Sequence, residues 1–466
     1  MSGLTSLSSR FSGRLLTEQA DVAPFLTDWR DMWHGRALGV AQPDTPQDVA
    51  AVVVWCSEHG VPIVPQGGNT GMSGGATPDG SGNALVLSLS RLDRIRSIDP
   101  VNDTISVDAG CILATVQAAA REASRFFPLS LGAEGSCTIG GNLATNAGGT
   151  GVLRYGNARD LCLGIEVVTA EGKIWDGMRA LRKDNSGYDL RDLMIGSEGT
   201  LGIITGAVLK LFPAPTAHIT AFLGLHSVRS ALELFHDVKA RFGEALSAFE
   251  LVSSQAMDLV EAHIPGSRNP IGSAAWYALV ELSLFGEDEK SRDVFEALLA
   301  DAFGRGTICD ATIAASQAQA LALWRIRESI SEAQSSAGKT IKHDIALPLS
   351  SITPFLKAAQ AATRPLVADM IPVTFGHLGD GNLHYNFSPR PGASQSRFVA
   401  SQSALNTVIH DLAVDHGGTF SAEHGLGALR TAEAERLKSP VEMALMASVK
   451  QALDPKGILN PGKVFA

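Results

Sequence analysis

Glycine is the residue type that most constrains how this chain can fold. The sequence has 47 glycines among 466 residues, and 25 of them lie between Gly60 and Gly206. Glycine is usually about 7% of a protein, so the first half of the chain is strongly enriched. Because glycine has no Cβ, a dense run of it lets the main chain approach another molecule closely. The first half therefore contains segments suited to close backbone contact with a ligand.

Length and composition describe a large folded protein with roughly two or three domains. Hydrophobic residues make up 45% of the chain and charged residues only 18%. No apolar run is long enough for a transmembrane helix. The net charge of −10, without any basic run, argues against a nucleic-acid or anionic-membrane partner. The first residues lack the apolar core of a signal peptide, and the five cysteines are widely spaced without a CxxC pair. We expect a reduced, cytoplasmic protein.

The pattern of predicted elements changes near Pro213. Before it, helical spacing and short β runs predict helices at 46–60 and 112–124, strands at 61–65, 84–92, 104–110 and 199–213, and a hairpin at 163–175. After it, the spacing predicts strands at 219–225 and 274–286 and helices at 227–243, 289–304 and 323–334. This alternation indicates an α+β domain on an antiparallel sheet, followed by a helical tail at 432–455. We predict domains at 1–213 and 214–420, and a C-terminal segment at 421–466.

Three glycine-rich segments could line one ligand. PQGGNTGMSGG (65–75) directly follows a predicted strand, and its N–H groups could surround a pyrophosphate or simply form a turn. It matches neither the GxGxxG fingerprint nor a Walker A loop. LGAEGSCTIGGNLATNAGGTGVLRYG (131–156) has almost no charge, as expected of backbone lying against a large planar ligand. GSEGTLGIIT (196–205) repeats this composition where the first domain ends.

The second half contains a candidate metal site. His377 and His384 lie in GHLGDGNLHYNF, and Glu423 and His424 lie in SAEHGLG. Two histidines and a carboxylate form a ligand set for a catalytic divalent metal with an open position. Adjacent residues of a strand point to opposite faces, so Glu423 and His424 can serve one pocket only where the backbone bends. On spacing alone, a zinc hydrolase without flavin would use the same residues.

The three glycine segments, in this order and spacing, resemble the flavin-binding domain of the vanillyl-alcohol oxidase or p-cresol methylhydroxylase (PCMH) superfamily. The resemblance runs from Phe25 to Phe465. It implies an α+β fold with a two-part FAD-binding domain of the PCMH type, an α+β cap domain with an antiparallel sheet, and a helical C-terminal segment that completes the active site. Many relatives bind the flavin covalently through a histidine of the first loop. No histidine lies between Gly60 and Gly206, so we expect non-covalent FAD.

The resemblance also implies which residues contact FAD. By this likeness the pyrophosphate is held by Gly67, Gly68, Asn69, Thr70 and Gly71, next to Pro65. The isoalloxazine side is lined by Gly135, Ser136, Gly140, Gly141, Asn142, Asn146 and Gly149. The adenosine side is lined by Glu198, Gly199 and Ile204, and Asn460 completes the set.

GHLGDGNLH followed by EHG resembles the D-2-hydroxy-acid dehydrogenase branch of this superfamily. In that branch the two histidines and the glutamate bind a divalent metal, usually zinc, and the last histidine is the general base. The likeness makes His377, His384 and Glu423 metal ligands and His424 the base. It further implies that the substrate is bound by Arg327, Ser331, Lys342 and Asn386.

The implied activity is the FAD-dependent, metal-assisted oxidation of a D-2-hydroxy acid to the 2-oxo acid, with hydride transfer to the flavin. The first glycine loop is closest to the members that act on D-2-hydroxyglutarate, so we expect 2-oxoglutarate as product. A dehydrogenase of the D-lactate or glycolate type is the alternative within the branch. The family implies an electron-transfer flavoprotein or a quinone as acceptor, and we expect a homodimer.

Overall fold

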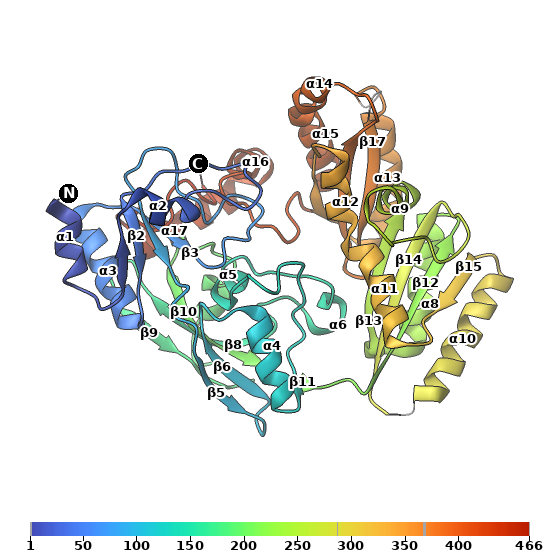
Figure 1. Ribbon diagram of the computed structural model, residues 1–466, viewed down its shortest axis with the longest axis horizontal. Coiled ribbons are helices and arrows are strands. Elements are labelled where there is room, and N and C mark those ends of the chain that lie inside the picture. The colour runs from blue at the N-terminus through green and yellow to red at the C-terminus, as the bar shows by residue number, and fades with distance from the viewer. Residues whose placement is uncertain (1, 287, 367–369, 466) are drawn as a thin grey trace. The chain divides into compact units, whose positions relative to one another are not determined.

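The computed structural model describes residues 2–286, 288–366 and 370–465 (Figure 1). Contacts between residues divide the chain into two compact units. The first unit comprises residues 1–149, 155–214 and 423–466, and the second comprises residues 150–154 and 215–422. Each unit has a hydrophobic core of its own. No described helix is long and apolar enough to cross a membrane.

A four-stranded sheet in the first unit carries the first glycine loop. Its order is β1-β2-β4-β3, with β2, β4 and β3 parallel. The expected helix is confirmed as α3 (Pro46–His59), with the Thr45 side chain as its N-cap and Gly60 ending it at φ +64°. The expected strand that follows is β3, so the glycine loop begins at the carboxyl end of a parallel strand. The strands of this sheet are β1 (Arg14–Leu16), β2 (Gly39–Gln42), β4 (Leu85–Ser88) and β3 (Ile63–Gln66).

A five-stranded antiparallel sheet forms the rest of the first unit's framework, in the order β5-β6-β10-β8-β9. The expected hairpin is confirmed as β8 and β9, with Gly172 in the turn at φ +75°. The strands are β5 (Ile95–Asp99), β6 (Thr104–Asp108), β8 (Cys162–Val168), β9 (Ile174–Gly177) and β10 (Ile203–Lys210). Around both sheets lie α1 (Ser2–Ser8), α2 (Gln19–Val22), η1 (Ala23–Phe25), α4 (Leu113–Glu122), β7 (Arg125–Phe126), α5 (Ile139–Ala144), α7 (Leu190–Met194) and β11 (Phe212–Pro213). Residues 152–154 of the short helix α6 (Val152–Tyr155) belong to the second unit.

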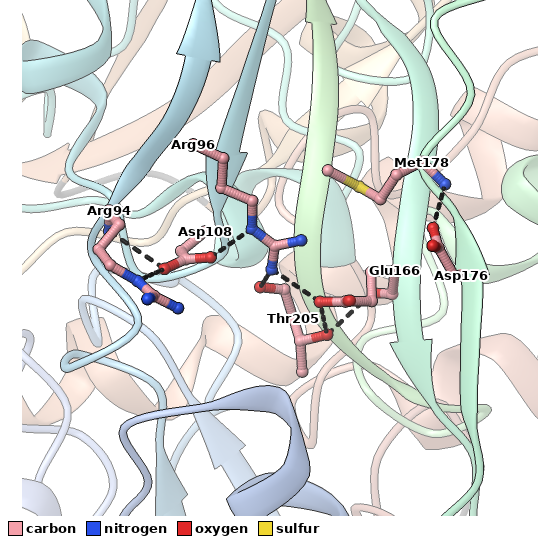
Figure 2. A network of polar contacts seen from close by, with 7 residues as sticks. All are labelled: Arg94, Arg96, Asp108, Glu166, Asp176, Met178 and Thr205. Atoms are coloured by element: carbon pink, nitrogen blue, oxygen red, sulfur yellow. Dashed lines mark hydrogen bonds and ion pairs between the residues drawn. The ribbon is translucent and has the colours of Figure 1, made fainter.

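Arg96 ties four strands of this sheet together (Figure 2). From β5, its Nε donates to the fully buried Asp108 of β6 at 2.6 Å, and its Nη2 donates to Glu166 of β8 at 2.7 Å. The Thr205 hydroxyl of β10 donates to the same Glu166 carboxylate. A Cβ on residue 206 would lie 2.7 Å from Arg96 Nη2, so Gly206 leaves room for the guanidinium. Buried charges are stable only when paired, so this network fixes the strands next to the third glycine segment.

The C-terminal segment belongs to the first unit. The expected helical tail is two helices, α16 (Thr431–Leu437) and α17 (Pro440–Leu453), because Pro440 starts a new helix that Ser439 caps. Beyond α17, the main chain of Asn460 donates to the carbonyl of Ile63 in β3. The last residues therefore pair with the strand that leads into the first glycine loop.

The second unit is built on a seven-stranded sheet, and the antiparallel sheet expected from the sequence is confirmed. Its order is β15-β12-β14-β13-β17-β18-β16, and every neighbouring pair is antiparallel. The strands are β12 (Ala217–Leu225), β13 (Leu246–Ser253), β14 (Trp276–Leu284), β15 (Ile308–Ile313), β16 (Asp344–Ala346), β17 (Met370–His377) and β18 (Asn382–Pro389).

Helices lie on both faces of this sheet (Figure 1), and their buried side chains belong to two separate hydrophobic clusters. One contains side chains of α8 (Val228–Phe242), α10 (Asp288–Gly304), α13 (Leu349–Thr363) and α15 (Gln402–Asp415). The other contains side chains of α9 (Ser254–His263), α11 (Gln317–Glu328) and α12 (Ile330–Ala337). The single helix expected at 323–334 is thus two helices that meet at Ser329. Short elements are η2 (Gly243–Ala245), η3 (Leu378–Asp380) and α14 (Gln395–Ala400).

Candidate active site

The three glycine segments of the first unit line one cavity. The expected cofactor residues in its wall are Pro65, Gly67, Gly68, Asn69, Thr70, Gly71, Gly140, Gly141, Asn142, Glu198, Gly199 and Ile204. His424, the expected base, lies in the same wall. The wall therefore combines the first glycine loop with residues that lie about 70 and 350 positions further along the chain.

The first glycine loop presents a row of unused donors to this cavity. Among the described residues, no main-chain N–H group from Gly67 to Ser73 donates a hydrogen bond. Asn69 adopts φ +54°, a left-handed conformation that turns successive N–H groups toward one side. Such a concave row of N–H groups binds anionic oxygens. The loop therefore fits the pyrophosphate of a dinucleotide.

The second segment packs closely on the first. A Cβ on Gly68 would lie 2.0 Å from the carbonyl oxygen of Ser136, so only glycine allows this approach. The Thr138 hydroxyl is buried in the cavity wall and has no hydrogen-bond partner among the described residues. An unsatisfied buried hydroxyl is costly, so a polar group of a ligand would be its natural partner.

Gln66 is a site residue that the sequence reasoning missed. Its amide donates to the carbonyl oxygens of Phe25 at 3.0 Å and Ala76 at 2.8 Å. Gln66 itself is buried at the end of β3, immediately before the loop. The bond to Ala76 ties the start of the glycine loop to its end, and the bond to Phe25 ties the loop to η1. The signal in the sequence that could have identified Gln66 is an amide side chain directly before a glycine-rich run.

Five expected cofactor residues do not line the cavity. Gly135 and Ser136 are exposed, and Asn146 accepts a hydrogen bond from the main chain of Arg159. Gly149 packs against the Ser130 carbonyl. Asn460 donates to the carbonyl oxygens of Gly75 and Glu198, both of which line the cavity. Asn146, Gly149 and Asn460 thus shape the loops rather than face the cavity.

Glu198 connects the cavity with the loop that follows the expected base. Its carboxylate accepts hydrogen bonds from the main-chain N–H groups of Leu426 at 2.7 Å and Gly427 at 2.8 Å. Burial raises the pKa of Glu198 above its ordinary value, although these two donors act in the opposite direction. Glu198 adopts a left-handed φ of +53° in the turn that precedes β10. Glu198 therefore fixes the backbone just after His424.

Glu423 and His424 point to the same side of the chain. Residues 422–424 form a bend instead of a strand, and Oε1 of Glu423 lies 3.8 Å from Nε2 of His424. Ser73 was also missed, and its hydroxyl donates to the carbonyl oxygens of His424 and Gly425. The condition for these two adjacent residues to serve one pocket is met.

His377 and His384 come together within the second unit. His377 ends β17 and His384 lies in β18, joined by the η3 turn in which Gly381 adopts φ +84°. The two ring centroids are 6.1 Å apart, with the ring planes inclined by 75°. Asp344 of β16 is paired with His384 in the sheet, and its Oδ1 lies 4.0 Å from His384 Nδ1. The hairpin thus brings the two imidazoles together.

Glu250 is a buried charged residue beside His377 that the sequence reasoning missed. It lies in β13 opposite His377, with its carboxylate 2.7 Å from His377 Nδ1 and 2.8 Å from Arg327 Nε. Burial alone would raise its pKa, but the contacts with His377 and Arg327 lower the pKa below its ordinary value. The signal was a single acid in the otherwise uncharged strand LSAFELVS.

The expected substrate residues have different environments. Arg327 of α11 is buried, its guanidinium lies over the Phe375 ring, and its Nη atoms have no hydrogen-bond partner among the described residues. Asn386 is buried and already bonded to Gln334 and to the main chain of His343. Ser331 is exposed, and Lys342 is half-buried before β16. Arg325, two residues before Arg327, is exposed.

The fold and the donor-rich cavity define an FAD-binding flavoprotein. Residues 37–177 match a model described as an FAD binding domain, and residues 214–464 match the C-terminal domain of FAD linked oxidases. The chain belongs to the FAD-linked oxidase family, and the expected PCMH-type fold is confirmed. These matches favour the flavin interpretation over the flavin-free zinc hydrolase.

Named relatives match over almost the whole chain. D-2-hydroxyglutarate dehydrogenase of Xanthomonas citri is 39% identical over 97% of this chain and 94% of its own length. The mitochondrial D-2-hydroxyglutarate dehydrogenase of Arabidopsis thaliana is 39% identical over 94% of this chain and 77% of its own length. A putative D-lactate dehydrogenase of Schizosaccharomyces pombe is 34% identical over 96% of this chain and 85% of its own length.

A solved structure of p-cresol methylhydroxylase shares the fold. It has a TM-score of 0.77 and 16% sequence identity, and the alignment covers 99% of this chain and 96% of that chain. At this identity the likeness describes the fold alone.

Proposed function

We propose that this flavoprotein is a dehydrogenase of D-2-hydroxy acids and that D-2-hydroxyglutarate is its substrate. The observation that carries the proposal is the position of His424 in the wall of the flavin cavity. A base there can act on a substrate that reacts with the flavin. The relatives named D-2-hydroxyglutarate dehydrogenase, which match nearly the full chain, support the choice of substrate.

We further propose that His377, His384 and Glu423 bind one divalent metal, with zinc as the expected ion. The centroids of the two imidazole rings lie 6.1 Å apart within one hairpin. The main chain of Ala422 donates to the carbonyl oxygen of Asp344, whose strand pairs with His384. Glu423 follows Ala422 directly, so chain connectivity brings this carboxylate to the strand that carries the histidine. Imidazole and carboxylate together suit zinc.

The remaining roles follow from the chemistry of each side chain. When bound, FAD supplies the hydride acceptor and the metal supplies a Lewis acid. His424 takes up the proton of the substrate hydroxyl, a task suited to imidazole, whose unperturbed pKa is about 6.5. Arg327 holds the carboxylate next to the reacting carbon through its unused Nη atoms. Lys342 binds the distal carboxylate of a diacid, while Ser331 and Asn386 contact the substrate.

We also propose how FAD is held, where the electrons go, and where and in which assembly the protein acts. FAD is held without a covalent bond, since the first loop has no histidine. Electrons leave to an electron-transfer flavoprotein or a quinone. The protein acts in the cytoplasm as a homodimer.

Anaerobic titration of the bound flavin tests the activity and the substrate together. D- and L-isomers of 2-hydroxyglutarate, malate, lactate and mandelate are added, and flavin absorbance is followed. We expect D-2-hydroxyglutarate to bleach the flavin at the lowest concentration. Faster reduction by L-isomers would contradict the stereochemistry, and no reduction by any hydroxy acid would contradict the activity. A colourless protein after purification would contradict FAD binding.

Replacing Lys342 distinguishes a dehydrogenase that acts on a diacid from one of the D-lactate type. Lys342→Met should raise KM for D-2-hydroxyglutarate by about 10-fold or more and leave D-lactate kinetics unchanged, because a charge-assisted hydrogen bond contributes about 1.5–3 kcal/mol. The exposed Lys339, three residues away, provides the matched control Lys339→Met. Equal effects on both substrates would refute a role for Lys342 at the distal carboxylate.

A further inference from the structure

Glu250 is an unusual residue for its position. All eight residues of β13 are buried, and Glu250 is its only charge, with 1% of its surface exposed. Burying a carboxylate costs several kcal/mol unless strong partners compensate. A hydrophobic residue would fill this strand position more cheaply. The two partners of Glu250 therefore indicate what the carboxylate contributes.

The first partner is His377. Glu250 Oε1 lies 2.7 Å from His377 Nδ1, and the two residues are directly paired between β13 and β17. An ionised carboxylate only accepts hydrogen bonds, so Nδ1 must carry the proton. In the neutral imidazole this leaves Nε2 without a proton and able to bind a metal. The contact thus selects one tautomer and one ring orientation for His377.

The second partner is Arg327. Glu250 Oε2 accepts from Arg327 Nε at 2.8 Å, and the guanidinium lies 5.0 Å from the centroid of the Phe375 ring. Because Nε is hydrogen-bonded to Glu250 and the guanidinium lies over the Phe375 ring, the orientation of the guanidinium plane is fixed. The edge formed by the two Nη atoms is then the edge left to pair with a carboxylate.

We propose that Glu250 is a positioning residue that prepares His377 for metal binding and Arg327 for substrate binding at the same time. It acts through these two side chains and contacts neither ligand. This inference rests on the proposed function, because that proposal assigns the metal to His377. One carboxylate then couples the orientation of the metal ligand to that of the substrate-binding arginine.

The informative variant is Glu250→Gln. Glutamine keeps the shape but offers one acceptor oxygen, so one partner must face its NH₂ group. A hydrogen bond to the charged guanidinium is the stronger one, which keeps the amide oxygen on Arg327 and turns the NH₂ group to His377 Nδ1. His377 then carries its proton on Nε2, the atom required for the metal.

The test uses the full-length, FAD-loaded protein stripped of metal. Competition with a chelator measures the Kd for Zn²⁺, and nitrogen NMR of labelled histidines reports the His377 tautomer. We expect the Nδ1–H tautomer in the unsubstituted protein and the Nε2–H tautomer in Glu250→Gln. Loss of such an outer hydrogen bond typically weakens metal binding about 10- to 100-fold. Activity of the variant should recover at saturating Zn²⁺.

A matched control distinguishes the orientation of His377 and Arg327 by Glu250 from a general role in attaching helix α11 to the sheet. Glu281 of β14 accepts from the Trp324 indole of the same helix at 2.6 Å, and its other side-chain partners are Thr220, Ser247 and His218. Glu281→Gln should therefore change stability without changing the Kd for Zn²⁺ or the tautomer. If Glu250→Gln kept both the Kd and the tautomer, the inference would be overturned.

The variant His384→Asn distinguishes a failure of the proposed metal site from a failure of the role proposed for Glu250. Should this variant bind Zn²⁺ as tightly as the unsubstituted protein, the metal proposal is wrong. The tautomer of His377 in the metal-free protein still tests the role of Glu250 in that case. An Nε2–H tautomer there would overturn the inference even with the metal site intact.

Discussion

The hydroxyl of Ser73 lies 3.1 Å from the carbonyl oxygen of His424 and donates a hydrogen bond to it. These residues are 351 positions apart, one in the first glycine loop and the other in the segment of the expected base. The same hydroxyl also lies 3.2 Å from the carbonyl oxygen of Gly425. The loop that fits the pyrophosphate therefore also holds the backbone of His424.

Replacing Ser73 by alanine should slow flavin reduction while FAD stays bound. Without the hydroxyl the His424 backbone gains freedom, and small displacements of catalytic groups can cost up to about 100-fold in rate. Stopped-flow reduction by D-2-hydroxyglutarate measures the effect, with an expected loss of about 10- to 100-fold. Ser88→Ala is the control, since Ser88 is buried in the neighbouring strand and its hydroxyl bonds to the Ser90 hydroxyl. Equal rates for Ser73→Ala and the unsubstituted protein would contradict this role.

His424→Ala should abolish flavin reduction and leave FAD in place. General base catalysis contributes about 10²- to 10⁴-fold, and the expected loss lies in that range. The flavin spectrum of the purified variant checks cofactor content, and anaerobic mixing with substrate checks the chemistry. His59→Ala, at an exposed histidine of the same unit, should behave as the unsubstituted protein. Unchanged bleaching in His424→Ala would show that another group removes the proton.

Metal removal should suppress turnover without releasing the flavin. The proposed ligands His377 and His384 belong to the second unit, whereas the glycine loops of the cavity belong to the first. Dialysis against a chelator, followed by activity and absorbance measurements, tests this separation. Added Zn²⁺ should restore activity in the unsubstituted protein and fail to do so in His377→Asn. Full activity of metal-stripped protein would reject the metal.

Stability should depend on pH through His218. A hydrogen bond to Glu281, opposed by burial and helped by the carboxylate charge, raises the pKa of His218 above its ordinary value. Its stabilising contribution is then complete below the unfolded-state pKa of about 6.5 and is lost as the pH rises through the higher folded-state pKa. The side chain is 45% exposed, so the contribution should be only about 0.2–1 kcal/mol.

Thermal unfolding of His218→Gln tests this sign. The Tm deficit of the variant should be larger at about pH 6 than at about pH 9, where the unsubstituted histidine is neutral too. His236→Gln, at an exposed position of α8, serves as the control. A deficit that grows with rising pH would mean that the neutral imidazole is the stabilising form.

Local features of the sequence predicted much of the fold and part of the site. The helix at α3, the hairpin of β8 and β9, and the antiparallel sheet follow from spacing and turn residues that act over a few positions. The turn between His377 and His384 is equally local, because the two residues are seven positions apart and Gly381 between them adopts a left-handed conformation.

Glu250 shows why the rest could not be predicted. Its partners His377 and Arg327 are 127 and 77 positions away, and they meet it only because β13 pairs with β17 in one register. A shift of one residue would turn every side chain of the strand to the other face. Ser73 and Glu198 were likewise joined to residues 425–427 by loop packing that no local pattern encodes.

The sequence by itself determined which backbone segments are rich in residues without a Cβ atom. The concentration of glycine between Gly60 and Gly206 specified the ligand-binding segments, because only residues without a Cβ permit such contacts. Only the tertiary structure decided which side chains hold those segments and orient the reacting groups. Hydrogen bonds between distant residues depend on strand register and loop packing, which are properties of the whole fold.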